Sequence, residues 1–356
     1  MPGVRTYPLD DTDQELLNLI QVDFPVESRP FRALADKLGI EESAVIERLV
    51  ALKSARIIRQ ISAIFDTRAL GYKSSLVATR APDDKVDEVA HVINDHPGVS
   101  HNYRRDHEFN IWWTIAVPPT SSLEDHVQAV HEISGGEATR LMHTIRMFKI
   151  GVDLDMTGKR AADARTTIPA YRHSPKAGEP LDDGEIALLR ELQEDIALEP
   201  EPFAGMASRI GITEQDVLDS AHRFVVEGRM RRFAAVLHHR QAGFVANAMS
   251  VWKVPEERIE EVGTAMAGFA AVSHCYQRPT YADWPYNVFG MLHGRTKEDC
   301  EESADAIARD TGVAEHAMLY STKEYKKVRV RYYEPAFFEW ERKHLAGGSS
   351  GNGSPS

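Results

Sequence analysis

The sequence predicts an α+β protein, a tandem repeat of a winged helix-turn-helix followed by a ferredoxin-like β-α-β-β-α-β domain. The first reason is an internal repeat. The motif V-S-H-N-Y-R-R at 99–105 returns as V-S-H-C-Y-Q-R at 272–278, so that His274 follows His101 by 173 positions (274 − 101). The second reason is that helical and strand-like patterns occur in the same order around both copies. These copies are called the first half and the second half below.

Each half opens with the pattern of a winged helix-turn-helix. In the first half, Asp10 and its neighbours offer N-caps to a helix over 9–21, and Pro30 suits the first turn of a second helix. Gly39 ends that helix, a third begins at Glu41, and an apolar strand-like run follows. The same signals return 172 positions later, in L-D-D at 181–183, P-F at 202–203 and I-G-I at 210–212.

The next stretch of each half has the pattern of a ferredoxin-like sandwich. In the first half we expect a strand over 74–79, a helix over 84–95, strands over 99–105 and 109–117, a helix over 123–133 and a last strand over 139–150. The predicted domains are a winged helix-turn-helix at 1–62, a ferredoxin-like domain at 63–156, a linker at 157–180, a winged helix-turn-helix at 181–234, a ferredoxin-like domain at 235–335 and a C-terminal segment at 336–356. The Gly/Ser-rich end of that segment, from 346, is expected to be disordered.

Composition restricts the class of protein. No apolar run approaches the roughly 18 residues of a membrane span, and the N-terminus lacks the apolar core of a signal peptide. Two cysteines, Cys275 and Cys300, make a disulfide framework or an iron–sulfur cluster improbable, so a cytoplasmic location is expected. The net charge of −12 and the acidic third helix of each winged domain argue against DNA binding.

The segment from Val272 to His293 is the most functionally suggestive part of the sequence. It combines aromatic rings, an arginine and imidazoles at a density that suits a flat, anionic ligand. His274, Tyr276 and Arg278 alternate, so on a strand all three side chains point to one face. The large aromatic residues Trp112, Trp113, Trp284 and Phe289 are instead expected in the core.

The architecture resembles the Lrp/AsnC superfamily of amino-acid-responsive regulators, and finer motifs are similar to those of siroheme decarboxylases. R-R-F-A-A-V-L-H-H-R-Q-A-G-F-V-A-N-A-M at 231–249 and S-H-C-Y-Q-R-P-T-Y-A-D-W-P-Y-N at 273–287 look like signatures of that family. H-N-Y-R-R-D-H-E-F-N-I-W-W-T at 101–114 looks like its partner subunit. A chain with both halves resembles the fused NirDL type of heme d1 biosynthesis, to which the two-subunit enzymes of AhbA with AhbB are related.

This resemblance implies a carboxy-lyase that removes carbon dioxide from two acetate side chains of siroheme to give didecarboxysiroheme, for heme d1 or the alternative heme pathway. Siroheme brings its own iron, so no added metal or organic cofactor is expected. Eight carboxylates around a flat ring require cations at the rim of the site, and arginine forms the better fork. The substrate-binding residues we expect are Arg278, Tyr276, Asn287, Arg231, Arg240, Lys326, Tyr103, Arg105, Asn110 and Lys149.

Loss of carbon dioxide leaves electrons on a methylene carbon that must then be protonated, and histidine is suited to this task near neutral pH. The candidates for catalysis are His274, His239 and His101, with His293 also in the second half. The first half has Thr67 where the second has His239, and it lacks the segment P-T-Y-A-D-W-P-Y at 279–286. We therefore expect the second half to carry the better site.

The two halves are expected to pair through their sandwiches as an intramolecular pseudo-dimer. A higher homo-oligomer and further subunits of the heme d1 pathway stay open as partners. Two other functions stay open as well: an Lrp/AsnC-type transcription regulator and a tetrapyrrole-binding carrier without catalysis. Membrane association is not expected.

Overall fold

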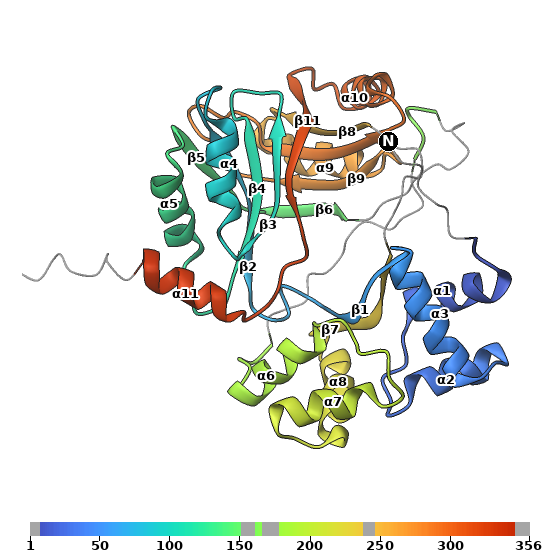
Figure 1. The fold of residues 1–356 in the computed structure, drawn as a ribbon. Coiled ribbons are helices and arrows are strands. Elements are labelled where there is room, and N and C mark those ends of the chain that lie inside the picture. Colours follow the sequence, from blue (N-terminus) through green and yellow to red (C-terminus); the bar gives the residue numbers. More distant parts are fainter. Residues whose placement is uncertain (1–7, 151–160, 166–177, 238–245, 346–356) are drawn as a thin grey trace, which may run out of the picture. The chain divides into compact units, whose positions relative to one another are not determined.

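The computed structural model describes residues 8–150, 161–165, 178–237 and 246–345 (Figure 1). The chain divides into two compact units. Unit 1 comprises residues 1–72, 175–240 and 331–333, and unit 2 comprises 73–174, 241–330 and 334–356. Each unit takes segments from both halves, so like domains group together. Much of the predicted linker at 157–180 and the predicted disordered tail from 346 lie outside the described residues.

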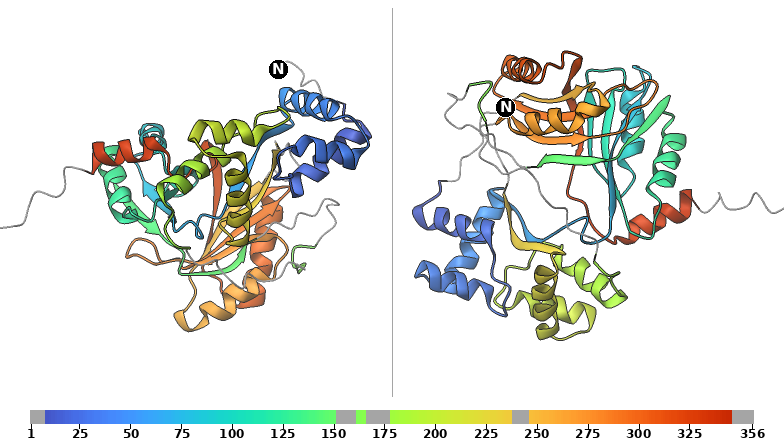
Figure 2. Two further views of the ribbon diagram at one scale, coloured as in Figure 1. Left: turned by 90° about the horizontal axis from the view of Figure 1, so that it is seen from below. Right: turned by 180° about the vertical axis from the view of Figure 1, so that it is seen from behind.

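Unit 1 contains the two winged helix-turn-helix domains. Its elements are α1 (Asp11–Val22), α2 (Pro30–Leu38), α3 (Glu42–Ser54), β1 (Ile58–Phe65), α6 (Asp183–Leu192), α7 (Pro202–Ile210), α8 (Glu214–Val226) and β7 (Met230–Leu237). The wing strands β1 and β7 pair with each other antiparallel, and the right view of Figure 2 shows helices of the two halves (blue and yellow-green) flanking them. The pairing is reciprocal: Phe24 N donates to Phe233 O at 2.8 Å, and Ile196 N donates to Ile61 O at 2.9 Å.

Local signals explain why the helices begin and end where they do. Asp10 and Asp182 each form a capping box at the start of the first helix of their half. Pro30 occupies the first turn of α2, and Gly39 ends it in the left-handed conformation, with φ of 68°. The winged domains were therefore predictable element by element.

Unit 2 is built around one nine-stranded sheet. Its strands are β2 (Lys73–Arg80), β3 (Val99–Arg105), β4 (Ile111–Val117), β5 (Ala138–Met142), β6 (Arg146–Ile150), β8 (Ala246–Trp252), β9 (Val272–Gln277), β10 (Val288–Gly294) and β11 (His316–Lys327). Its helices are α4 (Val86–Asn94), α5 (Leu123–Ser134), η1 (Glu256–Arg258), α9 (Ile259–Ala267), α10 (Lys297–Thr311) and α11 (Pro335–His344). The strand order is β5-β2-β4-β3-β11-β8-β10-β9-β6. Helix α11 gives an ordered structure to part of the C-terminal segment.

The two halves exchange their last strands within this sheet. Strand β11 pairs with β8 of its own half and then with β3 of the first half, whereas β6 of the first half pairs with β9 (Figure 1). The single strand predicted over 139–150 is thus two strands, because the chain leaves its own sheet after Met142 and joins the other half. The predicted pseudo-dimer of sandwiches is confirmed.

Among the described residues of unit 2, three apolar clusters form the core. One lies under α9 and α10, one lies under α4, α5 and α11, and the third joins strands of both halves. Phe148 of β6 belongs to the α9 cluster, where a Cβ on Gly263 would lie 2.4 Å from its ring. Trp112 and Trp284 are buried in the shared cluster, while Trp113 is buried under α4 and α5. Across the described part of the chain, no helix combines the length and apolar character needed to cross a bilayer.

Candidate active site

The histidine, tyrosine and arginine of the repeated motif lie on one face of their strand in both halves. On β9, Cys275 points the other way, and its Sγ contacts Gly263 O of α9 at 3.6 Å. His274, Tyr276 and Arg278 therefore project from the face turned away from that helix. The His274 and Tyr276 rings stack with centroids 6.2 Å apart, and the Arg278 guanidinium lies 4.8 Å from the centre of the Tyr276 ring.

Strand β3 repeats this arrangement. Asn102 points toward α4 and donates to Ala90 O at 3.0 Å, which leaves His101, Tyr103 and Arg105 on the opposite face. The His101 and Tyr103 rings stack at 6.3 Å, and Arg105 lies 6.0 Å from the centre of the Tyr103 ring. The spacing in the sequence had predicted this shared direction.

Both arginines are buried cations. Burial lowers the pKa of Arg105 and of Arg278 to about 10. Arg105 NH1 donates to Leu319 O at 2.7 Å, and Arg278 NH1 donates to Met142 O. In both side chains the buried Nε finds no partner among the described residues. A buried guanidinium with an unused N–H and no paired carboxylate is suited to an anionic ligand.

The surroundings of the two histidines differ. His274 Nδ1 lies 2.8 Å from Ser273 Oγ, which lies 2.7 Å from His293 Nε2. Burial first, and then His293 and Lys149, lower the pKa of His274; burial also lowers that of His293. The second half therefore has two imidazoles joined by one hydroxyl.

In the first half, His101 Nδ1 lies 3.0 Å from Ser100 Oγ, which contacts Thr114 Oγ1 at 2.9 Å instead of a second imidazole. Burial and Lys327 lower the pKa of His101, which Glu324 opposes. Glu324 pairs with Tyr103 across the strands. Burial first, and then Glu324, raise the pKa of Tyr103 to about 12.

The strand neighbours make the two sites electrostatically unequal. Glu324 and Lys327 of β11 lie opposite Tyr103 and His101. In the second half, Met147 and Ile150 of β6 lie opposite Tyr276 and His274. The second-half site thus has an apolar border where the first-half site has an acid and a base.

The two asparagines of the repeat clamp the backbone. Asn110 accepts from Ala81 N at 3.0 Å and donates to Ala81 O at 2.8 Å. Asn287 does the same with Val254, at 3.0 and 2.8 Å. Both ends of each amide are therefore occupied by main chain. This geometry does not support the expected contact with a substrate carboxylate, and it indicates a structural role.

The two lysines extend from the exchanged strands to the ends of the other half's helices. Lys149 Nζ donates to Phe269 O at 2.9 Å, just beyond α9. Lys326 Nζ donates to Asn94 O at 2.6 Å, at the end of α4. A cation at the carbonyl end of a helix is favourable. Lys149 pairs across the strands with Cys275, whose side chain is on the face opposite His274, so the structure places it behind the site.

The remaining predicted site residues lie elsewhere in the chain. Arg231 is on β7 in unit 1, where Nε and NH2 donate to Asp66 Oδ2 at 2.9 and 2.6 Å. Burial acts to raise the pKa of Asp66, but hydrogen bonds from Ala69 and Arg231 lower it overall. His239 and Arg240 lie outside the described residues.

The segment absent from the first half, residues 279–286, connects the two halves. Tyr281 OH donates to Leu141 O at 2.7 Å, and Asp283 forms a two-point ion pair with Arg140. Trp284 is buried as expected and packs 5.2 Å from Trp112. The segment therefore holds β5 of the first half against the second half through side-chain contacts.

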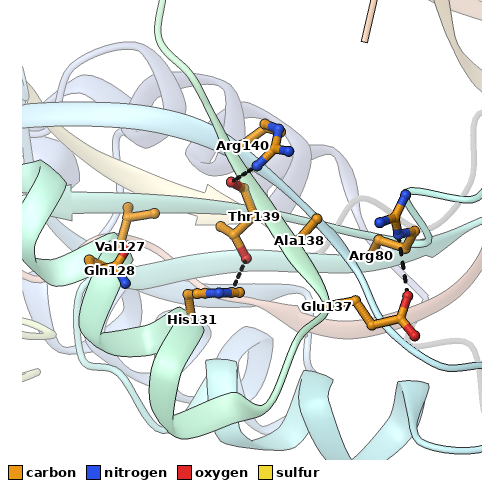
Figure 3. A pocket seen from close by; sticks show the side chains of 8 residues that line it. All are labelled: Arg80, Val127, Gln128, His131, Glu137, Ala138, Thr139 and Arg140. Atoms are coloured by element: carbon orange, nitrogen blue, oxygen red, sulfur yellow. Dashed lines mark hydrogen bonds and ion pairs between the residues drawn. The ribbon is translucent and has the colours of Figure 1, made fainter. Parts of the chain in front are cut away.

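Polar pockets lie beside strands of the first half, one next to β3 and its partner β11 and another next to β2 and β5. One, of about 350 Å³, is lined by Asp83, Arg104, Arg105, Asp106, His107, Asn110, Thr322 and Lys323. The other, of about 310 Å³, is shown in Figure 3. There Arg80 is paired with Glu137, and His131 with Thr139. With its charges already paired, this second pocket offers little to a polycarboxylate.

No group of three or more His, Cys, Asp or Glu side chains within the described ranges is arranged to hold a metal ion. The residues that sequence reasoning overlooked are Ser100 and Ser273. Both stand directly before the histidine in the repeated V-S-H triplet, which was the signal that could have identified them.

Known proteins share both domain types. Residues 69–149 and 241–326 match the AsnC-like ligand binding domain, and residues 13–59 and 185–231 match the siroheme decarboxylase NirDL-like HTH domain. A siroheme decarboxylase of Hydrogenobacter thermophilus is 41% identical over 327 residues, which cover 92% of this chain and 96% of the relative. The siroheme decarboxylase beta subunit of Methanosarcina barkeri is 47% identical over 42% of this chain and 99% of its own length.

The fold agrees with these matches. Crystal structures of the siroheme decarboxylase NirDL, alone and in co-complex with an iron-uroporphyrin III analogue, are 36% identical in sequence. They cover 95% of this chain and 99% of their own, with a TM-score of 0.74. With its duplicated domains, its exchanged strands and its two rows of histidine, tyrosine and arginine, this chain belongs to the siroheme decarboxylases of the fused NirDL type.

Proposed function

We propose that this chain decarboxylates two acetate side chains of siroheme to didecarboxysiroheme, for heme d1 or the alternative heme pathway, and that the second-half site on β9 is the main site. The observation that carries the assignment of the site is the row His274, Tyr276 and Arg278 on one face of the strand. It places a proton-transfer group next to an aromatic ring and a buried cation whose Nε is unused.

The reaction needs few protein groups. The bond between the acetate carboxylate and its methylene carbon breaks, carbon dioxide leaves, and the electron pair stays on the methylene carbon, where the conjugated ring delocalises it. One proton then converts the methylene into a methyl group. We assign Arg278 to hold a substrate carboxylate through its fork and His274 to deliver the proton. Tyr276 offers a ring surface or a hydroxyl donor to the substrate.

The asymmetry between the halves supports the choice of site. Glu324, opposite Tyr103 in the first half, repels a substrate with eight carboxylates, and Lys327, opposite His101, offsets part of that repulsion. The corresponding border in the second half is Met147 and Ile150, which can pack against a macrocycle. His101, Tyr103 and Arg105 are proposed to form a weaker second site.

Some assignments depend on the family motif alone. His239 and Arg240 stay candidates for catalysis and carboxylate binding because they belong to the H-R-x-A-G motif. Arg231 stays a candidate for binding a substrate carboxylate, for which it would have to break its ion pair with Asp66. Lys149 and Lys326 are proposed to support the sites indirectly, by anchoring the exchanged strands. The iron is part of the substrate, and we propose that no added cofactor is required.

The mass of the product after incubation with siroheme tests this function. Loss of two carbon dioxide units is the expected result. Unchanged siroheme that stays bound to the protein would favour a tetrapyrrole carrier. Unchanged siroheme together with salt-sensitive retention of duplex DNA would favour a regulator. Gel filtration of the same sample reports whether the chain assembles further, and turnover by the purified chain alone reports whether it needs other subunits.

A further inference from the structure

We propose that Ser273 and His293 act with His274 as a proton relay, which carries a proton from solvent to the decarboxylated methylene carbon. This inference rests on the proposed function of the β9 site. It assigns Ser273 and His293 as positioning and relay residues, and of the three relay residues only His274 contacts the substrate.

The geometry forms a continuous hydrogen-bonded path. Ser273 Oγ lies 2.8 Å from His274 Nδ1 and 2.7 Å from His293 Nε2. Its third neighbour, Met291 O, is at 3.4 Å and competes weakly for the hydroxyl hydrogen. Ser273 is only 1% exposed, whereas both histidines are half-buried. The hydroxyl therefore connects the two imidazoles at a buried position that is closed to bulk solvent.

The hydrogen bonds also define the useful tautomers. If His293 Nε2–H donates to Ser273 Oγ, the serine hydroxyl donates to His274 Nδ1, and the hydrogen of His274 is then on Nε2. Within the described residues, the hydrogen bond of the His274 ring is the one at Nδ1, and Nε2 has no hydrogen-bond partner. That N–H is consequently available to the substrate face of β9.

Proton transfer along this path balances without an imidazolium. His274 Nε2 gives its hydrogen to the methylene carbanion, Ser273 passes its hydrogen to His274 Nδ1, and His293 Nε2 passes its hydrogen to Ser273. His293 Nδ1 takes one proton from solvent. One proton enters, one carbon–hydrogen bond forms, and the three side chains end as neutral groups. The lowered pKa values of His274 and His293 favour such neutral imidazoles at physiological pH.

The reaction itself requires a supply of protons. Each carboxylate that leaves as carbon dioxide consumes one proton, so one siroheme consumes two. A histidine enclosed beneath a bound macrocycle cannot recover its proton through the face that the substrate covers. In the first half the path from His101 passes through Ser100 to Thr114, a hydroxyl that does not take up a proton near neutral pH.

Three variants of the full-length chain test the relay. Ser273→Ala removes the bridge, His293→Ala removes the solvent end, and Ser250→Ala is the matched control. Ser250 is a buried serine of the same sheet that bonds Gly290 O and Trp252 but no imidazole. Single-turnover decarboxylation is measured with saturating siroheme, alongside siroheme titration and circular dichroism. We expect the first two variants to lose about 10²-fold or more in rate with unchanged affinity, and Ser250→Ala to keep the rate.

Chemical rescue separates a relay from a merely structural contact. Added imidazole is expected to restore the rate of His293→Ala but not that of Ser273→Ala, because only the former keeps the bridging hydroxyl. A parental rate in Ser273→Ala, or a loss confined to siroheme affinity, would overturn the relay. If the unaltered chain releases no carbon dioxide, the proposed function fails as well.

Discussion

Arg105 and Arg278 each bond to the main chain of the other half, at equivalent positions. Arg105 donates to Leu319 O at 2.7 Å, and Arg278 donates to Met142 O, which corresponds to Leu319 in the repeat. The residues that we assign to carboxylate binding thus also join the two halves. Pairing of the halves and assembly of the two sites are therefore one structural event.

Because these two arginines bond to the other half, we expect their substitution to lower both the stability of the chain and its affinity for siroheme. Arg278→Lys and Arg105→Lys should each destabilise the chain by about 1.5–3 kcal/mol, because a lysine cannot reproduce the guanidinium fork at a buried carbonyl. Arg278→Lys should also weaken siroheme binding more than Arg105→Lys. Urea denaturation and siroheme titration measure the two effects. Equal losses of affinity would contradict the preference for the second half.

The asparagine clamps predict a loss of stability without a loss of chemistry. Asn287→Ala leaves Val254 N and O without their side-chain partners, at an expected cost of about 1–3 kcal/mol. Asn110→Ala should behave alike at Ala81. Denaturant midpoints should fall while the single-turnover rate at saturating siroheme is kept. A slower rate at unchanged stability would contradict the structural role and indicate that these asparagines contact the substrate.

A buried histidine pair predicts acid sensitivity of the first-half core. Gly98 N donates to His96 Nδ1 at 2.9 Å, so His96 donates from Nε2 to His126 Nδ1 at 2.8 Å, and His126 donates to Glu341 at 3.2 Å. Burial first, and then His126, Lys326 and His344, hold the pKa of His96 well below its usual value. Burial also lowers the pKa of His126, against the opposing Glu341.

Because both folded pKa values are depressed, stability is complete above about pH 6.5, the pKa in the unfolded chain, and falls as pH drops below it. The expected loss is up to about 1.4 kcal/mol per pH unit for each histidine. Thermal unfolding between pH 7 and pH 5 measures it, and His126→Gln should flatten the slope. An unchanged slope in that variant would assign the acid sensitivity to other groups.

The winged domains are predicted not to bind duplex DNA at physiological salt. The basic side chains of the third helices are already paired: Arg48 with Asp13 and Lys53 with Asp195 in α3, and Arg223 with Glu185 in α8. DNA binding needs cations free to replace counterions at the phosphates. A gel shift with a random genomic fragment pool tests this. Salt-sensitive retention at nanomolar protein would show the prediction to be wrong.

Local sequence signals predicted the helices and strands better than they predicted which strands pair with each other. The N-caps, Pro30 and Gly39 set helix ends through neighbouring residues, and alternation on β9 set the direction of His274 and Arg278. The break after Met142 was not predictable, because the apolar pattern of 139–150 continues through it. Only the exchange of strands between halves, a non-local pairing, decides that β6 joins β9.

The same limit applies to the roles of individual residues. The recurrence of Asn110 as Asn287 and of Lys149 as Lys326 indicated that these positions have a role in both halves. It could not distinguish a structural contact from a substrate contact. The distinguishing partners, Ala81 and Phe269, are far away in the sequence. Recurrence of the motif also gave no sign that the two sites differ in charge. That difference appears only when β11 pairs with β3 and β6 with β9, which places Glu324 opposite Tyr103 and Met147 opposite Tyr276.

The difference between the two sites gives the most direct prediction about catalysis. His274→Ala should slow decarboxylation by about 10²- to 10⁴-fold at saturating siroheme, as expected when a positioned acid is lost. His101→Ala should cost less, because its site is bordered by Glu324 and its serine leads to Thr114. The measurement is single-turnover kinetics on both variants, with the product mass recorded at each time.

The product mass makes this comparison sharper. If both sites act, His101→Ala should accumulate a product that has lost one carbon dioxide, whereas His274→Ala should leave siroheme largely unchanged. Circular dichroism controls for the fold, since His274 stacks on Tyr276 and both variants remove a half-buried ring. A parental rate in His274→Ala would remove this residue from catalysis. An inactive His101→Ala beside an active His274→Ala would place the main site in the first half, despite the acid at its border.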